Sequence, residues 1–289
     1  MAKRILVTGA SGMLGSAVVR AFAAHPTNLV FAQYFKRAIT PSTNQIIPLQ
    51  LDIRDQMGVE KALAECRPDV IVHCAAFTDV SNAAQNFRDA LSLNVEATHH
   101  LIRSSQRYHP FIVYISSDAI YPDVPEPKSE ALTPAPQSEY GLTKLWGEEL
   151  ITSLSTNHMI IRTTIIGNAK GQLFHWLKSS ATQGQPLKLF NDVWFSPISV
   201  NLLAKIIVKA DTQAIRGIYN IASHDKITKA DLGQWVIEHT NPGCPWEACS
   251  ISSIDPTGKR SKFMALDCQK IEAEIGPMPT AKESFYDLI

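Results

Sequence analysis

Short apolar runs alternate with amphipathic stretches along the first half of the chain. Six compact runs rich in β-branched residues have the length of strands and lie at 5–7, 29–34, 46–51, 70–74, 111–115 and 159–161. Apolar residues spaced three and four apart predict helices at 13–24, 56–65, 87–108 and 140–154. Because the strand runs are continuously apolar, we expect both faces to be buried, which is typical of parallel strands covered by helices. The pattern predicts an α/β fold with a doubly wound parallel sheet of the Rossmann type.

After residue 162 the pattern becomes less regular and predicts a smaller, mixed α/β lobe. It contains helical spacing at 171–182 and 199–210 and a short strand at 217–221. Thr228, with Asp231 three residues later, predicts the capped start of a further helix. We therefore expect a Rossmann domain at 1–165 and a second lobe at 166–289. Part of the chain near 192–222 is expected to return to the Rossmann domain.

One long connection, at 121–139, interrupts the alternation. It carries prolines at 122, 125, 127, 134 and 136, which exclude a helix or a central strand over most of its length. A long loop in a compact domain is more often functional than idle. Since it follows an apolar strand, we expect it at the sheet edge where open α/β sheets bind ligands.

The composition narrows the class of protein. The 289 residues include 27 Lys and Arg and 27 Asp and Glu, a balance that argues against a nucleic-acid partner. Hydrophobic residues make up 45% of the chain, and no apolar run approaches the roughly 18 to 20 residues that a membrane span needs. Five scattered cysteines without a Cys-x-x-Cys pair suit free thiols in a reducing compartment. We expect a cytoplasmic protein without a metal site.

A glycine-rich turn follows the first predicted strand and opens the first predicted helix. Its glycines, at positions 9, 12 and 15, let a backbone approach a pyrophosphate, which the helix N-terminus then stabilises. This context, a strand before the turn and a helix after it, favours dinucleotide binding over a plain glycine turn. The candidate cofactor residues of the turn are Gly9, Ser11, Gly12, Met13, Leu14 and Gly15.

The end of the second strand indicates which dinucleotide is bound. NAD-binding proteins place an acidic residue there, whereas this chain has Lys36 and Arg37. A guanidinium pairs with a 2′-phosphate through two hydrogen bonds, so we expect NADP(H), with NAD(H) as the alternative. Asp52, followed by Ile53, is placed to meet the adenine amine, although capping a turn is an equally ordinary use of Asp.

Candidate catalytic residues follow the fifth strand and open a later helix. Ser117 and Asp118 stand at the strand end, and Tyr140 and Lys144 lie one turn apart on one helix face. An ammonium close to a phenol favours the phenolate, so we expect Lys144 to pull the Tyr140 pKa toward working pH. Ser117 can hold the oxygen of a reacting carbonyl or hydroxyl. His73, at the end of a buried strand, is expected to be a packed, hydrogen-bonded residue.

Together with Cys74-Ala75-Ala76 and Asn94, these motifs resemble the extended short-chain dehydrogenase/reductases over nearly the whole chain. Within them the chain is most similar to the dTDP-4-dehydrorhamnose reductase branch. The resemblance implies hydride transfer from NAD(P)H to the C4 ketone of a nucleotide-linked deoxysugar. Tyr140 would give the proton, Lys144 would hold the nicotinamide ribose, and Ser117 would orient the ketone.

The resemblance also implies further site residues and a partner. Ala75 and Ala76 would contact the cofactor, and Asn94 would organise the active-site helix. The first domain would bind NADP(H) and the second the substrate, and the protein would form a homodimer. The implied substrate residues are Thr78, Val80, Ser117, Asp118 and Trp194.

Three departures from the branch concern the substrate pocket. Residues 81–86 are uncharged where relatives carry a charged cluster, Ile165 stands near the place of a sugar-stacking Trp, and Phe195 replaces a glycine. Two alternatives stay open: an NADP-binding regulatory subunit without turnover, like the β subunit of methionine adenosyltransferase, and an NAD-dependent nucleotide-sugar epimerase or dehydratase. The basic pair at 36–37 disfavours the second.

Overall fold

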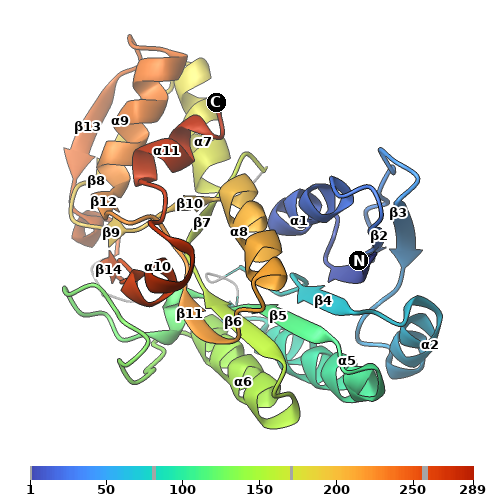
Figure 1. The fold of residues 1–289 in the computed structure, drawn as a ribbon. Helices are drawn as coiled ribbons and strands as arrows, with labels where there is room; N and C mark the ends of the chain where they lie inside the picture. The colour runs from blue at the N-terminus through green and yellow to red at the C-terminus, as the bar shows by residue number, and fades with distance from the viewer. Residues whose placement is uncertain (1, 80–82, 170–171, 256–259) are drawn as a thin grey trace. The chain divides into compact units, whose positions relative to one another are not determined.

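A seven-stranded sheet forms the centre of the computed structural model, which describes residues 2–79, 83–169, 172–255 and 260–289. The strands follow the order β11-β6-β5-β4-β1-β2-β3, and every pairing whose register is described is parallel (Figure 1). Their bounds are β1 (Arg4–Thr8), β2 (Leu29–Tyr34), β3 (Ile46–Gln50), β4 (Val70–His73), β5 (Phe111–Ile115), β6 (His158–Arg162) and β11 (Gly217–Asn220). The strand order reverses at β1 and β4, and open sheets of this kind bind ligands beyond the carboxyl ends of their strands there.

Helices cover both faces of this sheet. Figure 1 shows α2 (Gln56–Cys66), α5 (Ala97–Ser105) and α6 (Glu139–Leu154) on one side, with α1 (Met13–Ala23) and most of α8 (Val200–Thr212) on the other. A buried cluster joins the sheet to the first layer, and its members include Leu6, Ile71, Ile112, Ile160, Leu63, Leu101 and Ile151. The predicted doubly wound α/β fold is confirmed.

The helix predicted at 87–108 is present but not uniform. It consists of α4 (Phe87–Leu91), a π-helical turn (Ser92–Glu96), α5 and a 3-10 turn (Gln106–Tyr108). A π-turn lengthens the hydrogen-bonded loop by one residue and is common at functional sites. The apolar spacing along the sequence does not reveal it.

The chain divides into two compact units. The first comprises the chain up to residue 120 with 134–162 and 204–219, and the second comprises 121–133, 163–203 and 220–289. In the second unit α7 (Leu173–Thr182), α9 (Lys229–Thr240) and α11 (Ala281–Tyr286) pack with β8 (Leu187–Phe190) and β13 (Trp246–Cys249). The shared core includes Phe174, Leu177, Leu189 and Phe285.

Short strands and a capping box complete the second unit. Three strands, β12 (Ile227–Thr228), β9 (Trp194–Phe195) and β14 (Phe263–Met264), form one small sheet, and β7 (Ile165–Ile166) pairs with β10 (Ile198–Ser199). The capped start predicted for α9 is confirmed. The Thr228 hydroxyl accepts from Asp231 N at 3.0 Å, and the Asp231 carboxylate accepts from Thr228 N at 2.7 Å.

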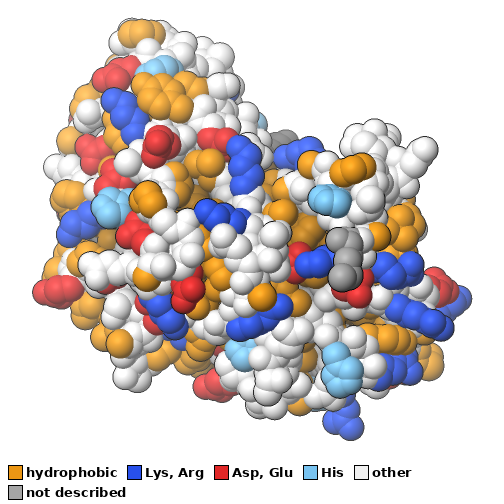
Figure 2. All heavy atoms as spheres, in the orientation of Figure 1, with side chains coloured by type: hydrophobic (Ala, Val, Ile, Leu, Met, Phe, Trp, Pro, Cys, Tyr) orange, Lys and Arg blue, Asp and Glu red, His pale blue; other side chains and the backbone are white. Residues whose placement is uncertain are grey.

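The surface carries mixed charge. On the face shown in Figure 2, Lys and Arg side chains lie among acidic and uncharged ones, in keeping with a formal net charge of zero. All five cysteines are free thiols. Over the ranges that the structure describes, no helix combines the length and the apolar character needed to cross a membrane.

Candidate dinucleotide and catalytic site

The glycine turn after β1 is too tight for other residues. Gly9 has a φ of 63°, in the left-handed region, and a Cβ on it would lie 2.7 Å from the backbone nitrogen of Ala75. A Cβ on Gly15 would overlap the carbonyl oxygen of Gly9. The turn is closed by a hydrogen bond from Gly12 N to Gly9 O at 2.8 Å. The glycine spacing therefore serves a close approach of three backbone segments.

The N-terminus of α1 suits an anion. Gly12 is the N-cap residue, the helix has no side-chain cap, and its first turn carries no acidic residue. The first backbone N–H groups of a helix have no partner within the helix, and the helix dipole is positive at this end. With Ser11, Met13 and Leu14 in the same turn, the residues present fit a pyrophosphate.

The side chain of Gln33, near the end of β2, uses both of its polar atoms in hydrogen bonds within the protein. Its side-chain oxygen accepts from Gly9 N at 2.8 Å, and its amide donates to the carbonyl oxygen of Leu51 at 2.6 Å. It thereby joins the glycine turn to the ends of β2 and β3. Since both polar atoms of its buried side chain are used, discrimination between cofactors falls to the residues beyond β2.

Those residues form a positively charged group around an exposed ring. The Phe35 side chain is 42% exposed, and the cationic groups of Lys36 and Arg54 each lie 5.6 Å from its centroid. Arg37 follows directly. The group fits a 2′-phosphate. The sequence alone does not point to Arg54, because only the fold brings it beside Phe35.

Asp52 is engaged by Arg54. The guanidinium donates to both carboxylate oxygens, at 2.9 Å from Nε and 2.6 Å from Nη2, and this hydrogen bonding lowers the Asp52 pKa. The backbone nitrogen of Arg54 also donates to Asp52, at 3.1 Å. The turn-capping use is thus observed, and contact with adenine stays a prediction. Ile53 is buried in the core, and its contact with a cofactor stays a prediction.

The fold brings together Ser117 and Tyr140, from the end of β5 and the start of α6. The Ser117 hydroxyl donates to the Asp118 carboxylate at 2.9 Å and accepts from Ala119 N at 3.2 Å, and a Cβ on Gly141, the residue after Tyr140, would overlap the Ala119 carbonyl oxygen. Ser138 caps α6 by accepting from Gly141 N at 3.1 Å, which fixes the turn that presents Tyr140.

The expectation that Lys144 lowers the Tyr140 pKa is wrong for this structure. Burial raises the Tyr140 pKa to about 12; the hydrogen bond with Ser117 opposes that rise, and the charge of Asp118 adds to it. The physical reason is that the low-dielectric site disfavours the phenolate more than its surroundings stabilise it. At neutral pH the phenol therefore keeps its proton, which is the form that a proton donor requires.

Lys144 itself is a buried amine with a low pKa. Burial lowers its pKa to about 7, and the charge of Glu148 opposes the shift. Its Nζ lies 4.1 Å from the ring centroid of Tyr114, and a Cβ on Gly147 would overlap the Tyr114 hydroxyl. A glycine at position 147 therefore leaves room for the Tyr114 ring, which lies beside the Lys144 amine.

Asn94 lies in the π-turn and connects two neighbouring segments. Its side-chain oxygen accepts from Phe77 N at 2.8 Å, and its amide donates to Phe77 O at 3.1 Å and to the Thr143 hydroxyl at 2.9 Å. Thr143 in turn donates to the carbonyl oxygen of Tyr140 at 2.9 Å. These contacts agree with the organising role that the resemblance implied for Asn94.

The remaining candidates lie in different parts of the chain. Ala75 and Ala76 follow β4, and the backbone of Ala75 lies against the glycine turn. Thr78 is exposed further along the same segment, and Val80 lies outside the described residues. Trp194 belongs to the second unit, where it begins β9.

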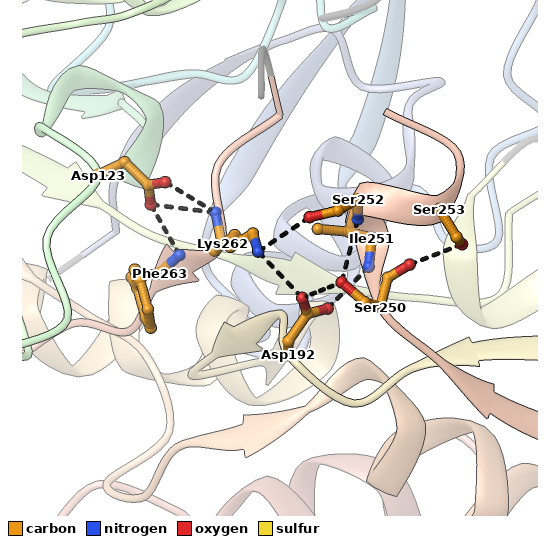
Figure 3. Close-up of polar contacts among 8 residues, drawn as sticks. All are labelled: Asp123, Asp192, Ser250, Ile251, Ser252, Ser253, Lys262 and Phe263. Carbon is orange, nitrogen blue, oxygen red and sulfur yellow. Dashed lines mark hydrogen bonds and ion pairs between the residues drawn. The ribbon is translucent and has the colours of Figure 1, made fainter. Parts of the chain in front are cut away.

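Two carboxylates hold the segment beside Trp194 (Figure 3). The carboxylate of Asp123, in the proline-rich connection, accepts from Lys262 N at 3.0 Å and from Phe263 N at 2.8 Å. Asp192 accepts from the Ser250 hydroxyl at 2.6 Å, from Ile251 N at 2.8 Å and from the Lys262 ammonium at 3.1 Å. These anchors fix β14 next to β9. The sequence alone does not reveal these anchors, because their partners are 58 to 140 residues away along the chain.

A Rossmann-type sheet, a glycine turn opening α1, and Ser117 beside Tyr140 with Lys144 one turn further define the class of the extended short-chain dehydrogenase/reductases. Within this class, the model of the RmlD substrate binding domain matches residues 3–288, so the chain belongs to that family. The predicted resemblance to the dTDP-4-dehydrorhamnose reductase branch is confirmed.

Known proteins of two kinds are similar to the chain. It is 28% identical over 293 residues to a probable low-salt glycan biosynthesis reductase, Agl14, of Haloferax volcanii, covering 98% of this chain and 96% of the relative. It is 31% identical over 290 residues to methionine adenosyltransferase 2 subunit beta of Bos taurus, covering 93% and 82%. The crystal structure of dTDP-4-dehydrorhamnose reductase from Bacillus anthracis in complex with NADP has a TM-score of 0.86 at 23% identity, covering 100% and 99%, and shows the same fold.

Proposed function

We propose that this protein is an NADPH-dependent reductase of the 4-keto group in a nucleotide-linked deoxysugar. The observation that carries the proposal is the packing of the segment after β5, which carries Ser117, against the start of α6, which carries the buried Tyr140: a Cβ on Gly141 would overlap the carbonyl oxygen of Ala119. In this proposal Ser117 orients the substrate ketone, and Tyr140 donates the proton to its oxygen as negative charge develops. Lys144, one turn further along α6, holds the nicotinamide ribose.

The cofactor part of the proposal rests on the first unit. NADPH, when bound, supplies the hydride. The glycine turn and the N-terminus of α1 hold the pyrophosphate, with Ala75 and Ala76 beside it. Lys36 and Arg37 hold the 2′-phosphate, because their cationic side chains stabilise a dianion that NADH lacks. Arg54, which lies beside Phe35, is paired with Asp52.

The substrate part rests on the relatives and on the second unit. Reductases of glycan and deoxysugar synthesis are among the relatives and solved structures, which supports a nucleotide-linked sugar. We propose that Thr78, Asp118 and Trp194 contact it, together with Val80. Phe195 is 2% exposed, and its ring packs in the core of the second unit, where a glycine would leave that space unfilled. Free thiols at all five cysteines favour a cytoplasmic location. We also propose that the protein forms a homodimer.

The test is NADPH oxidation by the purified protein against a panel of nucleotide-linked 4-keto sugars. We expect turnover with at least one of them, faster with NADPH than with NADH. Tyr140→Phe removes the phenol proton and keeps the ring, so it is expected to lose turnover and to retain NADPH binding. Turnover that is unchanged in Tyr140→Phe would refute the proposed chemistry.

A second candidate, a cofactor-binding regulatory subunit, is favoured by one observation. Relatives named methionine adenosyltransferase 2 subunit beta match 93% of the chain at 26 to 31% identity. The same experiment separates the two candidates. Tight NADPH binding without oxidation by any carbonyl substrate, in wild type and Tyr140→Phe alike, would support the regulatory subunit.

A further inference from the structure

A buried chain of hydrogen bonds runs through His73, between the glycine turn and the π-turn. The Thr8 hydroxyl lies 2.6 Å from His73 Nδ1, and the Thr98 hydroxyl lies 2.9 Å from His73 Nε2. Ala75 N donates to the Thr8 hydroxyl at 3.2 Å, and the Thr98 hydroxyl donates to the carbonyl oxygen of Asn94 at 2.8 Å. The His73 side chain is 1% exposed, and Thr8 and Thr98 are buried as deeply.

The direction of every bond in the chain follows from proton counting. A hydroxyl has one proton, and Thr98 gives its proton to the Asn94 carbonyl oxygen, so it must accept from His73 Nε2–H. Burial lowers the His73 pKa to about 3, with the charge of Lys144 adding to the shift, so the ring is neutral and Nδ1 has no proton. Nδ1 must then accept from the Thr8 hydroxyl, whose oxygen accepts from Ala75 N. One tautomer satisfies all four groups.

The two ends of this series of hydrogen bonds belong to different halves of the site. Thr8 precedes Gly9, whose turn lies against the backbone of Ala75. At the other end, Asn94 bonds to Thr143, which bonds to the carbonyl oxygen of Tyr140. The neutral imidazole is thus the central link between the turn proposed to hold the pyrophosphate and the helix that carries Tyr140 and Lys144.

We propose that His73 is a positioning residue, fixed as the Nε2–H tautomer, that couples the cofactor turn to the helix carrying Tyr140 and Lys144. It contacts neither the cofactor nor the substrate in this proposal. Its effect reaches the cofactor through Thr8 and Ala75, and it reaches Tyr140 through Thr98 and Asn94. The inference rests on the cofactor part of the proposed function, and its test does not require turnover.

The first measurement is the ¹⁵N chemical shift of the two His73 nitrogens in wild-type protein between pH 5 and 8. We expect a protonated Nε2 and an unprotonated, hydrogen-bonded Nδ1 across the whole range. A proton on Nδ1, or titration of the ring within this range, would overturn the inference. This measurement needs no variant and therefore survives any folding defect.

The second measurement is NADPH affinity in two matched variants of α5. Thr98→Val removes the hydroxyl that accepts from His73 Nε2–H. Thr98 itself lies outside the glycine turn. Ser105→Ala, the control, removes an equally buried hydroxyl that donates to Ile102 O at 2.9 Å and lies outside the chain of bonds. We expect Thr98→Val to weaken NADPH binding about fivefold, the equivalent of one hydrogen bond, and Ser105→Ala to leave it unchanged.

A conservative variant at position 98 tests whether the hydroxyl itself is responsible for the change in NADPH affinity. Thr98→Ser keeps the hydroxyl and should restore the wild-type affinity. Equal affinities in Thr98→Val and Ser105→Ala, with wild type binding NADPH, would overturn the coupling and leave the proposed function intact. Failure of the wild type to bind any dinucleotide would instead overturn the proposed function.

Discussion

Proton uptake on cofactor binding follows from the low pKa of Lys144. With a pKa of about 7, roughly a tenth of the Lys144 side chains carry a proton at pH 8. The negative charge of a bound dinucleotide raises the pKa of a nearby amine. If binding raises that pKa well above 8, nearly all Lys144 side chains are protonated in the complex, so binding at pH 8 takes up roughly 0.9 proton. At pH 6 most Lys144 chains already carry the proton, and uptake falls to about 0.1.

Isothermal titration calorimetry in buffers of different ionisation enthalpy measures this uptake directly. Three other buried groups do not change protonation between pH 6 and 8. The pKa values of Cys74 and Tyr140 are raised to about 12, and the pKa of His73 is lowered to about 3. Lys144→Met should abolish the uptake at pH 8, and NADH should give the same uptake as NADPH. Zero uptake at pH 8 in wild type, or uptake that persists in Lys144→Met, would refute the reasoning.

Three further changes have expected outcomes. Arg37→Ala should weaken NADPH binding about tenfold or more and leave NADH binding unchanged, which titration with both cofactors measures. Gly15→Ala should cost at least about tenfold in affinity for either cofactor, since its Cβ overlaps the carbonyl oxygen of Gly9; equal affinity would contradict the tight turn. Arg162→Met leaves the buried Glu148 carboxylate without its 2.7 Å partner, and urea denaturation should show a loss of about 3–5 kcal/mol. A loss below about 1 kcal/mol would show that this pair is not effectively buried.

The elements of the first unit were predictable because each depends on local pattern. Continuous apolar runs located the strands from β1 to β6 within one residue at either end. The glycine turn was equally accessible, since the spacing of its glycines reflects a clash between backbone segments that any side chain would cause. The capping box at Thr228 is likewise a signal confined to four residues.

Contacts between distant residues were beyond the reach of such patterns. Gln33 stands where a cofactor contact was expected nearby, yet the fold uses both ends of its side chain for Gly9 and Leu51. The position of Arg54 beside Phe35 requires the pairing of β2 with β3. The Tyr140 pKa depends on burial, which the spacing of Tyr140 and Lys144 does not report.

Transfer of deuterium from NADPH that carries deuterium at both hydrogen positions of nicotinamide C4 tests the central claim most directly. The reductase account predicts that the label appears on the former carbonyl carbon of a nucleotide-linked sugar, at one deuterium per NADPH oxidised. Tyr140→Phe should bind the labelled cofactor and transfer little or none of it. Absence of label from every 4-keto sugar tested, despite tight NADPH binding, would contradict the account and leave the regulatory subunit as the better description.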